Sequence, residues 1–164
     1  MYPHLVLTLV LAAAPFTQAA PATQKPAADK PAPAAAAKGV RTVEIVGSED
    51  MKFSLATITA KPGEQLRIRL VVKGAMPKVA MAHNFVLLTK GAKVVDFATA
   101  AMNARATDFI PAEKKADIVA HTTLAGAGET VEVTFKVPAA GEYPFLCSFP
   151  GHFQAGMKGS LVVK

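Results

Sequence analysis

The sequence predicts a single all-β domain, an antiparallel sandwich or barrel with a small helical flap. Short runs of alternating apolar and polar residues recur from Val40 to the C-terminus, and Gly, Pro or Asn lies between most of them. One Ala-rich stretch, residues 96–115, breaks this pattern. At 164 residues the chain has room for one domain and a tail, but hardly for two domains.

Each predicted strand has the length of an ordinary β-strand. The clearest is Q-L-R-I-R-L-V-V at residues 65–72, which follows a Lys-Pro-Gly turn. Residues 96–115 are expected to form a helical turn or flap between strands, ended by Pro111. Regularly spaced short strands of this kind are typical of an antiparallel sandwich or barrel. The predicted strands span residues 40–46, 65–72, 84–88, 117–121, 130–137, 142–147 and 159–163.

The N-terminal residues are expected to lie outside this domain. Residues 1–19 resemble a signal peptide, because an apolar run is followed by small residues that permit cleavage after Ala19. An uncleaved membrane anchor is the alternative, although the run is shorter than the ~20 residues that span a bilayer. Residues 20–39, rich in Ala, Pro and Lys, read as a disordered linker. We therefore expect a folded domain at residues 40–164, located in the periplasm, with membrane attachment only through the N-terminal segment.

The charge distribution argues against nucleic acid as a partner. The formal net charge is +6, but the basic residues are scattered along the sequence. A nucleic-acid footprint would be expected as a run or stripe of Lys and Arg. The positive charge therefore favours acidic partners only in a general way.

One segment near the C-terminus combines three metal-binding side chains. Cys147, the only cysteine, is followed by His152 and Met157. A lone thiol in an exported protein needs a reason to remain unpaired, and a bound metal supplies one. A thiolate, an imidazole and a weak thioether suit copper, whereas zinc has little use for Met. The segment therefore predicts a copper site.

A second imidazole is needed to complete such a site, and three other histidines exist. His4 lies in the predicted signal peptide, and His121 reads as a surface residue of a strand. His83 lies at the start of an apolar strand, whose end can direct a side chain toward a neighbouring loop. We favour His83.

The motifs around these residues resemble one branch of a known family. H-N-F-V from His83 and C-S-F-P-G-H-x4-M-K-G-S-L from Cys147 are similar to the two copper-binding stretches of azurins and auracyanins, which are cupredoxins. The resemblance covers residues 40–164 and implies a cupredoxin-like Greek-key β-sandwich. Four residues separate His152 from Met157, as in auracyanins, whereas azurins have three.

The resemblance implies a role for each residue of the site. His83, Cys147 and His152 match the equatorial copper ligands, and Met157 matches the axial ligand. Three further positions match residues that surround the ligands. Ala82 matches a residue whose carbonyl can approach copper weakly, and Asn84 matches one whose side chain ties the two ligand loops together. The backbone N–H groups of Asn84 and Phe149 match those that donate to the thiolate sulfur.

The function implied by the resemblance is electron transfer, not catalysis. The expected partners are redox proteins such as c-type cytochromes or terminal reductases and oxidases, docking transiently near His152. A multicopper oxidase would need histidines beside the cysteine, whereas Leu146 and Ser148 lie there. A periplasmic copper-binding or copper-delivery protein remains the alternative. The residues that are candidates for an apolar docking patch are Met76, Pro77, Met81, Phe153 and Ala155.

Overall fold

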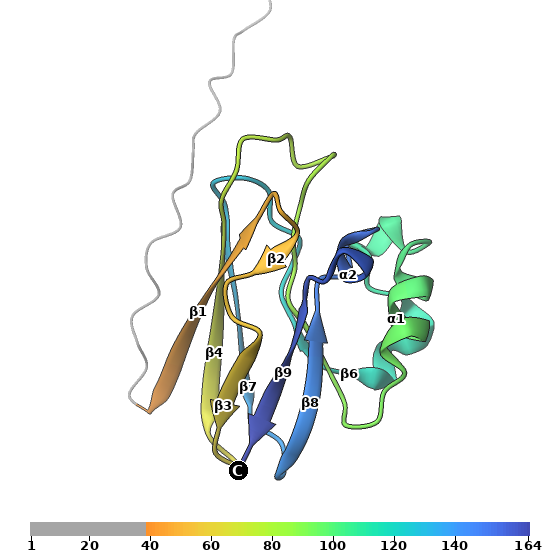
Figure 1. Ribbon diagram of the computed structural model, residues 1–164. Coiled ribbons are helices and arrows are strands. Elements are labelled where there is room, and N and C mark those ends of the chain that lie inside the picture. The colour runs from red at the N-terminus through yellow and green to blue at the C-terminus, as the bar shows by residue number, and fades with distance from the viewer. Residues whose placement is uncertain (1–38) are drawn as a thin grey trace, which may run out of the picture. The chain divides into compact units, whose positions relative to one another are not determined.

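The computed structural model describes residues 39–164, which form two β-sheets and a helical flap (Figure 1). The first sheet has the strand order β2-β1-β4-β7, and the second has the order β3-β9-β8-β5-β6. This confirms the predicted all-β sandwich with a small helical insertion. The strands are β1 Val40–Ser48, β2 Lys52–Phe53, β3 Thr57–Ala60, β4 Gln65–Val72, β5 Val86–Leu88, β6 Ile118–His121, β7 Thr130–Lys136, β8 Gly141–Leu146 and β9 Lys158–Val163. The helices are α1 Val94–Ala101, α2 His152–Ala155 and the 3-10 helices η1 Arg105–Thr107 and η2 Ala112–Asp117.

The main hydrophobic core lies between the two sheets. The first sheet contributes Leu66 and Ile68 to it, and the second contributes Phe145 and Leu161, all of them fully buried. Burial alternates along β4 as its sequence pattern predicted, because successive side chains of a strand point to opposite faces. The outward-facing Arg69 pairs with glutamates of the neighbouring strands β1 and β7.

Two strand pairs are parallel, which corrects the prediction of a purely antiparallel sandwich. β1 pairs with β4 in parallel, and β3 pairs with β9 in parallel. The short strands β2 and β3, which the sequence did not reveal, separate β1 from β4 along the chain. Apolar alternation reports which face of a strand is buried, but not the direction of its neighbour. The pairing direction was therefore not predictable from the pattern.

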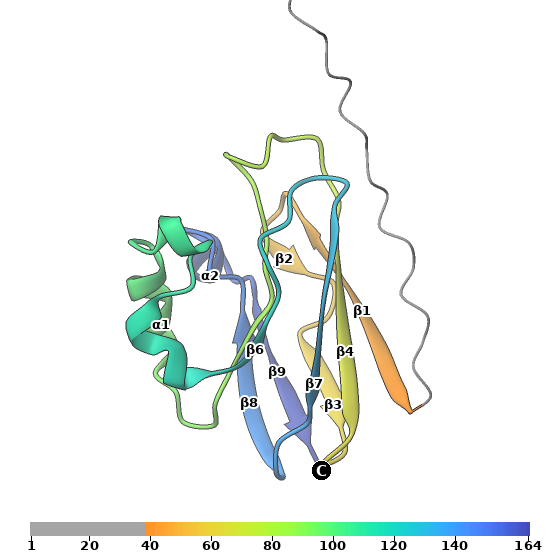
Figure 2. The same ribbon diagram turned by 180° about the vertical axis from the view of Figure 1, so that it is seen from behind.

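The flap covers the outer face of the second sheet (Figure 2). Phe97 of α1 is fully buried and belongs to one cluster with Leu88 of β5 and Leu146 of β8. Pro111 does not end the helical segment as predicted, since η2 begins directly after it. Its φ of −68° and its missing N–H suit the start of a helix, where the N–H has no partner within the helix.

Among the described residues the first strand, β1, starts at Val40, where the first strand was predicted. The expected signal peptide at residues 1–19 and all but the last residue of the expected linker at 20–39 lie outside the described residues. Within residues 39–164, no helix has the length and apolar character required to cross a membrane.

Candidate metal centre

Three strand ends bring the predicted ligands together. His83 lies just before β5. Its N–H donates to the Ala125 carbonyl and its carbonyl accepts the Ala125 N–H, both at 2.8 Å. Cys147 directly follows β8, and Met157 directly precedes β9. Because β8 and β9 are antiparallel neighbours, the segment from Cys147 to Met157 is the loop that joins them. The Cys147 N–H closes this loop by donating to the Met157 carbonyl at 3.0 Å.

The loop is folded around the single helical turn α2. Gly151 before the turn and Gly156 after it have φ values of 84° and 100°, a region that favours glycine. The His152 N–H donates to the Phe149 carbonyl at 3.1 Å, and the Met157 N–H donates to the His152 carbonyl at 2.9 Å. The backbone at His152 and at Met157 is therefore fixed by hydrogen bonds within the loop itself.

The donor atoms of three of the predicted ligands converge. The distance between the Nδ1 atoms of His83 and His152 is 3.2 Å. The Sγ of Cys147 lies 4.0 Å from Nδ1 of His83 and 3.5 Å from Nδ1 of His152. Ligand atoms placed about 2.0–2.3 Å from a metal lie roughly 3.3–3.8 Å apart. The three side chains are thus arranged to hold one ion.

The fourth predicted ligand lies against the same site. An added Cβ at Gly47 of β1 would lie 3.1 Å from Cε of Met157 and 3.3 Å from two ring carbons of His83. The Met157 thioether and the His83 ring therefore flank the same glycine. Met157 is fully buried, as are His83 and Cys147, while His152 is 2% exposed.

Burial keeps the metal-free site electrically neutral. It raises the pKa of Cys147 to about 12, although the backbone N–H groups of Asn84 and Phe149 donate to the sulfur and oppose this shift. Burial and the neighbouring His83 lower the pKa of His152 to about 4. Burial also lowers the pKa of His83, and the Asp50 carboxylate offsets part of this effect. At neutral pH both imidazoles can therefore donate a lone pair, and a metal must displace only the thiol proton.

Asn84 joins the two ligand-bearing segments. Its Nδ2 donates to Ser148 Oγ at 2.8 Å and to the Asp108 carbonyl at 3.3 Å. Its Oδ1 accepts the Ser148 N–H at 2.8 Å. Both Asn84 and Ser148 are buried. The His83 segment, the Cys147 segment and the flap are thus bound to one amide side chain.

Two aromatic rings in edge and tilted contact support His152 from the flap side. The ring of Phe149 lies 4.7 Å from that of His152, and the ring of Phe109 lies 5.1 Å from that of Phe149. Asp108 and Phe109 both have positive φ values, of 53° and 61°. The flap therefore reaches the metal centre through a turn that few non-glycine residues adopt.

Several residues of the site were not singled out in the sequence. Gly47 is one, although its place at the end of an alternating strand gave a weak indication of a close approach. Ser148 is another, because nothing in its place beside Cys147 indicates its hydrogen bonds to Asn84. Ala82 is fully buried next to His83. The exposed His121 lies on β6, away from the cluster, as the sequence predicted.

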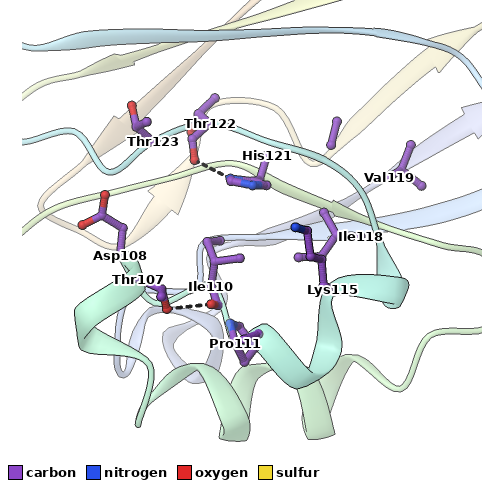
Figure 3. A pocket seen from close by; sticks show the side chains of 12 residues that line it. Thr107, Asp108, Ile110, Pro111, Lys115, Ile118, Val119, His121, Thr122 and Thr123 are labelled. Atoms are coloured by element: carbon purple, nitrogen blue, oxygen red, sulfur yellow. Dashed lines mark hydrogen bonds between the residues drawn. The ribbon is translucent and has the colours of Figure 1, made fainter.

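His121 instead lines a separate cavity between β6 and the flap (Figure 3). The cavity has a volume of about 500 Å³ and also contains Ile110, Pro111 and Ile118. None of the four predicted ligands lines it. Within residues 39–164, His83, Cys147 and His152 form the single cluster of His, Cys, Asp and Glu side chains with metal-binding geometry.

Comparison with known proteins decides the family. The model of the copper binding proteins of the plastocyanin/azurin family matches residues 40–164. The chain belongs to this family. Auracyanin-A of Chloroflexus aurantiacus is 38% identical to this chain over 128 residues. The alignment covers 76% of this chain and 75% of auracyanin-A. The solved structure of auracyanin A from that organism matches with a TM-score of 0.69 and 37% identity, covering 77% of this chain and all of the other.

Two further relatives belong to the comparison. The azurin of Pseudomonas denitrificans is 38% identical over 127 residues, covering 75% of this chain and 98% of the azurin. The copper-resistant cuproprotein CopI of Rubrivivax gelatinosus is 38% identical over 134 residues, covering 80% of this chain and 72% of the relative.

The family and the site geometry agree on the cofactor. A buried cluster of two imidazoles, one thiolate donor and a neighbouring thioether fits one type 1 copper ion. This plastocyanin/azurin-family protein is therefore a blue copper protein of the electron-carrier type and not an enzyme. An electron carrier acts by exchanging electrons with redox partners.

Proposed function

We propose that the protein is an exported, periplasmic carrier of single electrons, with copper held by His83, Cys147 and His152 and, more weakly, by Met157. The observation that carries this proposal is the convergence of three buried donor atoms within 4.8 Å of one another. Bound copper would take up one electron as Cu(II) and release it as Cu(I) at such a site.

The ligand frame is held by hydrogen bonds of the protein itself. His83 is fixed by Ala125, and the loop from Cys147 to Met157 is closed by its own backbone bonds. The buried Asn84 side chain ties these two segments together. Since the frame is packed and hydrogen-bonded, the ligands have little freedom to rearrange when the charge of the metal changes by one. Small rearrangement favours fast electron exchange.

The site is closed to small molecules. His83, Cys147 and Met157 are fully buried, and His152 is 2% exposed. A catalytic metal needs an open coordination position that a substrate can reach. Burial therefore supports a carrier, whose electron passes through a ligand and not through a bound substrate.

The surface beside His152 suits a transient partner. Phe149, in ring contact with His152, and Pro150 line a hollow of about 580 Å³ together with Val79 and Met102. Val79 is 72% exposed and Met102 is 43% exposed, so apolar side chains face the solvent here. Among the patch residues suggested by the sequence, Met76 is 41% exposed, whereas Met81, Phe153 and Ala155 are half-buried.

Charged side chains of both signs accompany this apolar surface. Arg105 and Asp108 line the hollow, as does Lys78, whose ammonium group is paired with Glu129. We infer a partner with a small apolar contact area, such as a c-type cytochrome or a terminal reductase or oxidase. Weak redox encounters use small interfaces of this kind, and complementary charge raises the rate of association.

The periplasmic location rests on the sequence. An apolar N-terminal run followed by small residues supports export, and cleavage after Ala19 fits the small-residue rule. N-terminal sequencing of the protein from a periplasmic fraction tests this part. A mature chain beginning at Ala20 is expected, while recovery of the intact N-terminus in the membrane fraction would contradict it.

Copper binding for resistance or delivery is the second candidate. The similarity to a copper-resistant cuproprotein favours it. The closed ligand frame opposes it, because delivery requires the ligands to release the metal. The two functions differ in what leaves the protein, an electron or an ion.

The test is to load the purified protein with Cu(II) and follow its absorption. The carrier function predicts an intense blue band that bleaches when a reduced c-type cytochrome is added and returns on reoxidation, with copper retained throughout. Cys147→Ser should bind copper without the blue band, because the thiolate is the source of the charge-transfer absorption. Rapid loss of copper to a metal-free acceptor protein, with no electron exchange, would instead establish delivery.

A further inference from the structure

The hairpin of β1 and β2 forms one wall of the copper site. Gly47 near the end of β1 touches both the Met157 thioether and the His83 ring. In the same hairpin Lys52 of β2 lies opposite Ser48. The Lys52 ammonium group extends across to the ligand loop, where it donates a hydrogen bond to the Ala155 carbonyl. The hairpin thus contacts the loop both beside the ligands and at its outer backbone.

We propose that Lys52 is a positioning residue of the copper site, which fixes the segment between His152 and Met157 and raises the reduction potential of the bound copper. This inference rests on the proposed copper site, and it assigns a role to a side chain that is not itself a ligand.

The Ala155 carbonyl receives its hydrogen-bond donor from outside the loop. Ala155 is the last residue of α2, a helix of one turn, and the last carbonyls of a helix receive no N–H donor from within it. The N–H groups that follow are already used, since those of Gly156 and Met157 donate to Phe153 and His152. A lysine at a helix C-terminus satisfies such a carbonyl and complements the negative end of the turn.

Gly156 makes room for this contact. It has a φ of 100°, and a Cβ at this position would overlap the Lys52 ammonium group. The glycine therefore serves the turn and leaves the space through which Lys52 reaches Ala155. A loop that ends in this way holds its next residue, Met157, in a fixed direction.

The contact bears directly on the axial ligand. Ala155 is two residues from Met157, whose N–H and carbonyl are both bonded within the loop. The Met157 side chain rests on Gly47 of the hairpin to which Lys52 belongs. The hairpin therefore holds Met157 from two directions, by packing on its thioether and by a hydrogen bond to the backbone before it.

The charge of Lys52 has a second effect. Within residues 39–164 no carboxylate lies in ion-pair distance of its ammonium group. An uncompensated positive charge near the metal disfavours the more highly charged Cu(II) state. Lys158 provides a comparison, because its ammonium group lies 4.9 Å from the ring centroid of Phe153 in the same loop, whereas that of Lys52 donates to the loop backbone.

The experiment compares the full-length proteins carrying Lys52→Met, Lys52→Arg and Lys158→Met with the unaltered protein. The reduction potential, the visible spectrum and the rate of copper loss to a chelator are measured on the copper form. Amide hydrogen exchange in the loop is measured on the metal-free form, so that one readout does not depend on copper.

Lys52→Met should lower the potential more than Lys158→Met does, and it should release copper about tenfold faster, the loss expected for one charge-assisted hydrogen bond. In the metal-free form the amides of Gly156 and Met157 should exchange faster in Lys52→Met only. Lys52→Arg should keep the reduction potential and the exchange rates of the unaltered protein, because arginine retains both the positive charge and a hydrogen-bond donor.

The inference is overturned if Lys52→Met and Lys158→Met shift the potential equally and leave loop exchange unchanged, since Lys52 would then act as a surface charge alone. It is also overturned if Lys52→Met behaves as the unaltered protein does. Failure of the proposed function is a different result: the unaltered protein would then form no blue copper complex at all.

Discussion

Gly47 is the position where the smallest change in sequence should have the most specific effect on the metal centre. Replacing it with alanine adds one methyl group between the Met157 thioether and the His83 ring. The added carbon would lie 3.1 Å from Met157 Cε and 3.3 Å from the His83 ring carbons Cγ and Cδ2. Ordinary carbon–carbon contacts are about 3.5–4.0 Å. To reach the short end of this range, Met157 Cε must move by about 0.4 Å and the His83 ring carbons by about 0.2 Å.

The structure limits how this overlap can be relieved. Gly47 is buried and has no positive φ, so the backbone itself tolerates alanine. His83 is held on both sides of its backbone by Ala125, whereas the Met157 side chain is the more flexible of the two. We expect Met157 to move away from the metal. Overpacking of this kind costs about 1–2 kcal/mol in the free energy of unfolding, which corresponds to a fall in Tm on the order of 5 °C.

Two assays separate the local effect from general destabilisation. Thermal unfolding of the metal-free protein measures the cost, and the visible spectrum and reduction potential of the copper form report the axial ligand. Ile58→Val is the matched control, because it removes one methyl group from the main core on β3 at a cost of about 1 kcal/mol. Gly47→Ala should change the spectrum and the potential, and Ile58→Val should change neither. An unaltered spectrum in Gly47→Ala would falsify the reasoning that Met157 and His83 are packed against this glycine.

Three further predictions follow from the contacts and charges of the site. Asn84→Leu leaves the N–H and hydroxyl of Ser148 buried without their partner, so the free energy of unfolding should fall by about 2–4 kcal/mol, measured by urea titration. Ser148→Ala should cost less, because its N–H keeps the Asn84 acceptor; equal losses would contradict the network. In the metal-free protein the pKa of His152 is about 4, whereas an unfolded imidazole titrates near about 6.5. The unfolded chain therefore takes up protons first as the pH falls, and stability should drop by about 2–3 kcal/mol between about pH 7 and pH 4.5. His152→Gln should make this slope shallower, and burial of His83, whose pKa is also lowered, accounts for the part that remains. A slope as steep as that of the unaltered protein would refute the assignment to His152. Finally, the thiol pKa of about 12 and the neutral imidazoles predict the release of about one proton per copper ion at neutral pH. Calorimetry in buffers of different ionisation enthalpy measures this number, and a value near zero would show that the thiol is already ionised.

The sequence alone determined the chemistry of the ligand loop. Cys147, His152 and Met157 lie so close along the chain that any compact loop brings their side chains to one region. Their donor types already select copper over zinc. Spacing along the chain could not identify His83 as the second imidazole ligand, because His83 is distant in the sequence from the loop of Cys147 to Met157. An apolar strand beginning at His83 favoured it over the exposed His121.

The sequence also determined the strands with strong alternation. β4 was predicted with both of its ends, because its apolar and charged residues alternate without interruption. β2 and β3 were missed, since a strand of two residues carries no period and β3 contains only one large apolar residue, Ile58. The parallel pairing of β1 with β4 was missed for a different reason: alternation is the same in either direction of pairing.

What only the tertiary structure decided is how the ligand loop is held. Its supports come from segments far away in the chain: Gly47 against Met157, Lys52 on the Ala155 carbonyl, and Asn84 on the Ser148 backbone. Each support is a contact of a few ångströms between strands or loops whose neighbourhood depends on the whole packing of the two sheets. Residue type and local spacing therefore identify the donors of the copper site. Long-range packing sets their directions and their freedom to move, and with them the properties of the metal that they hold.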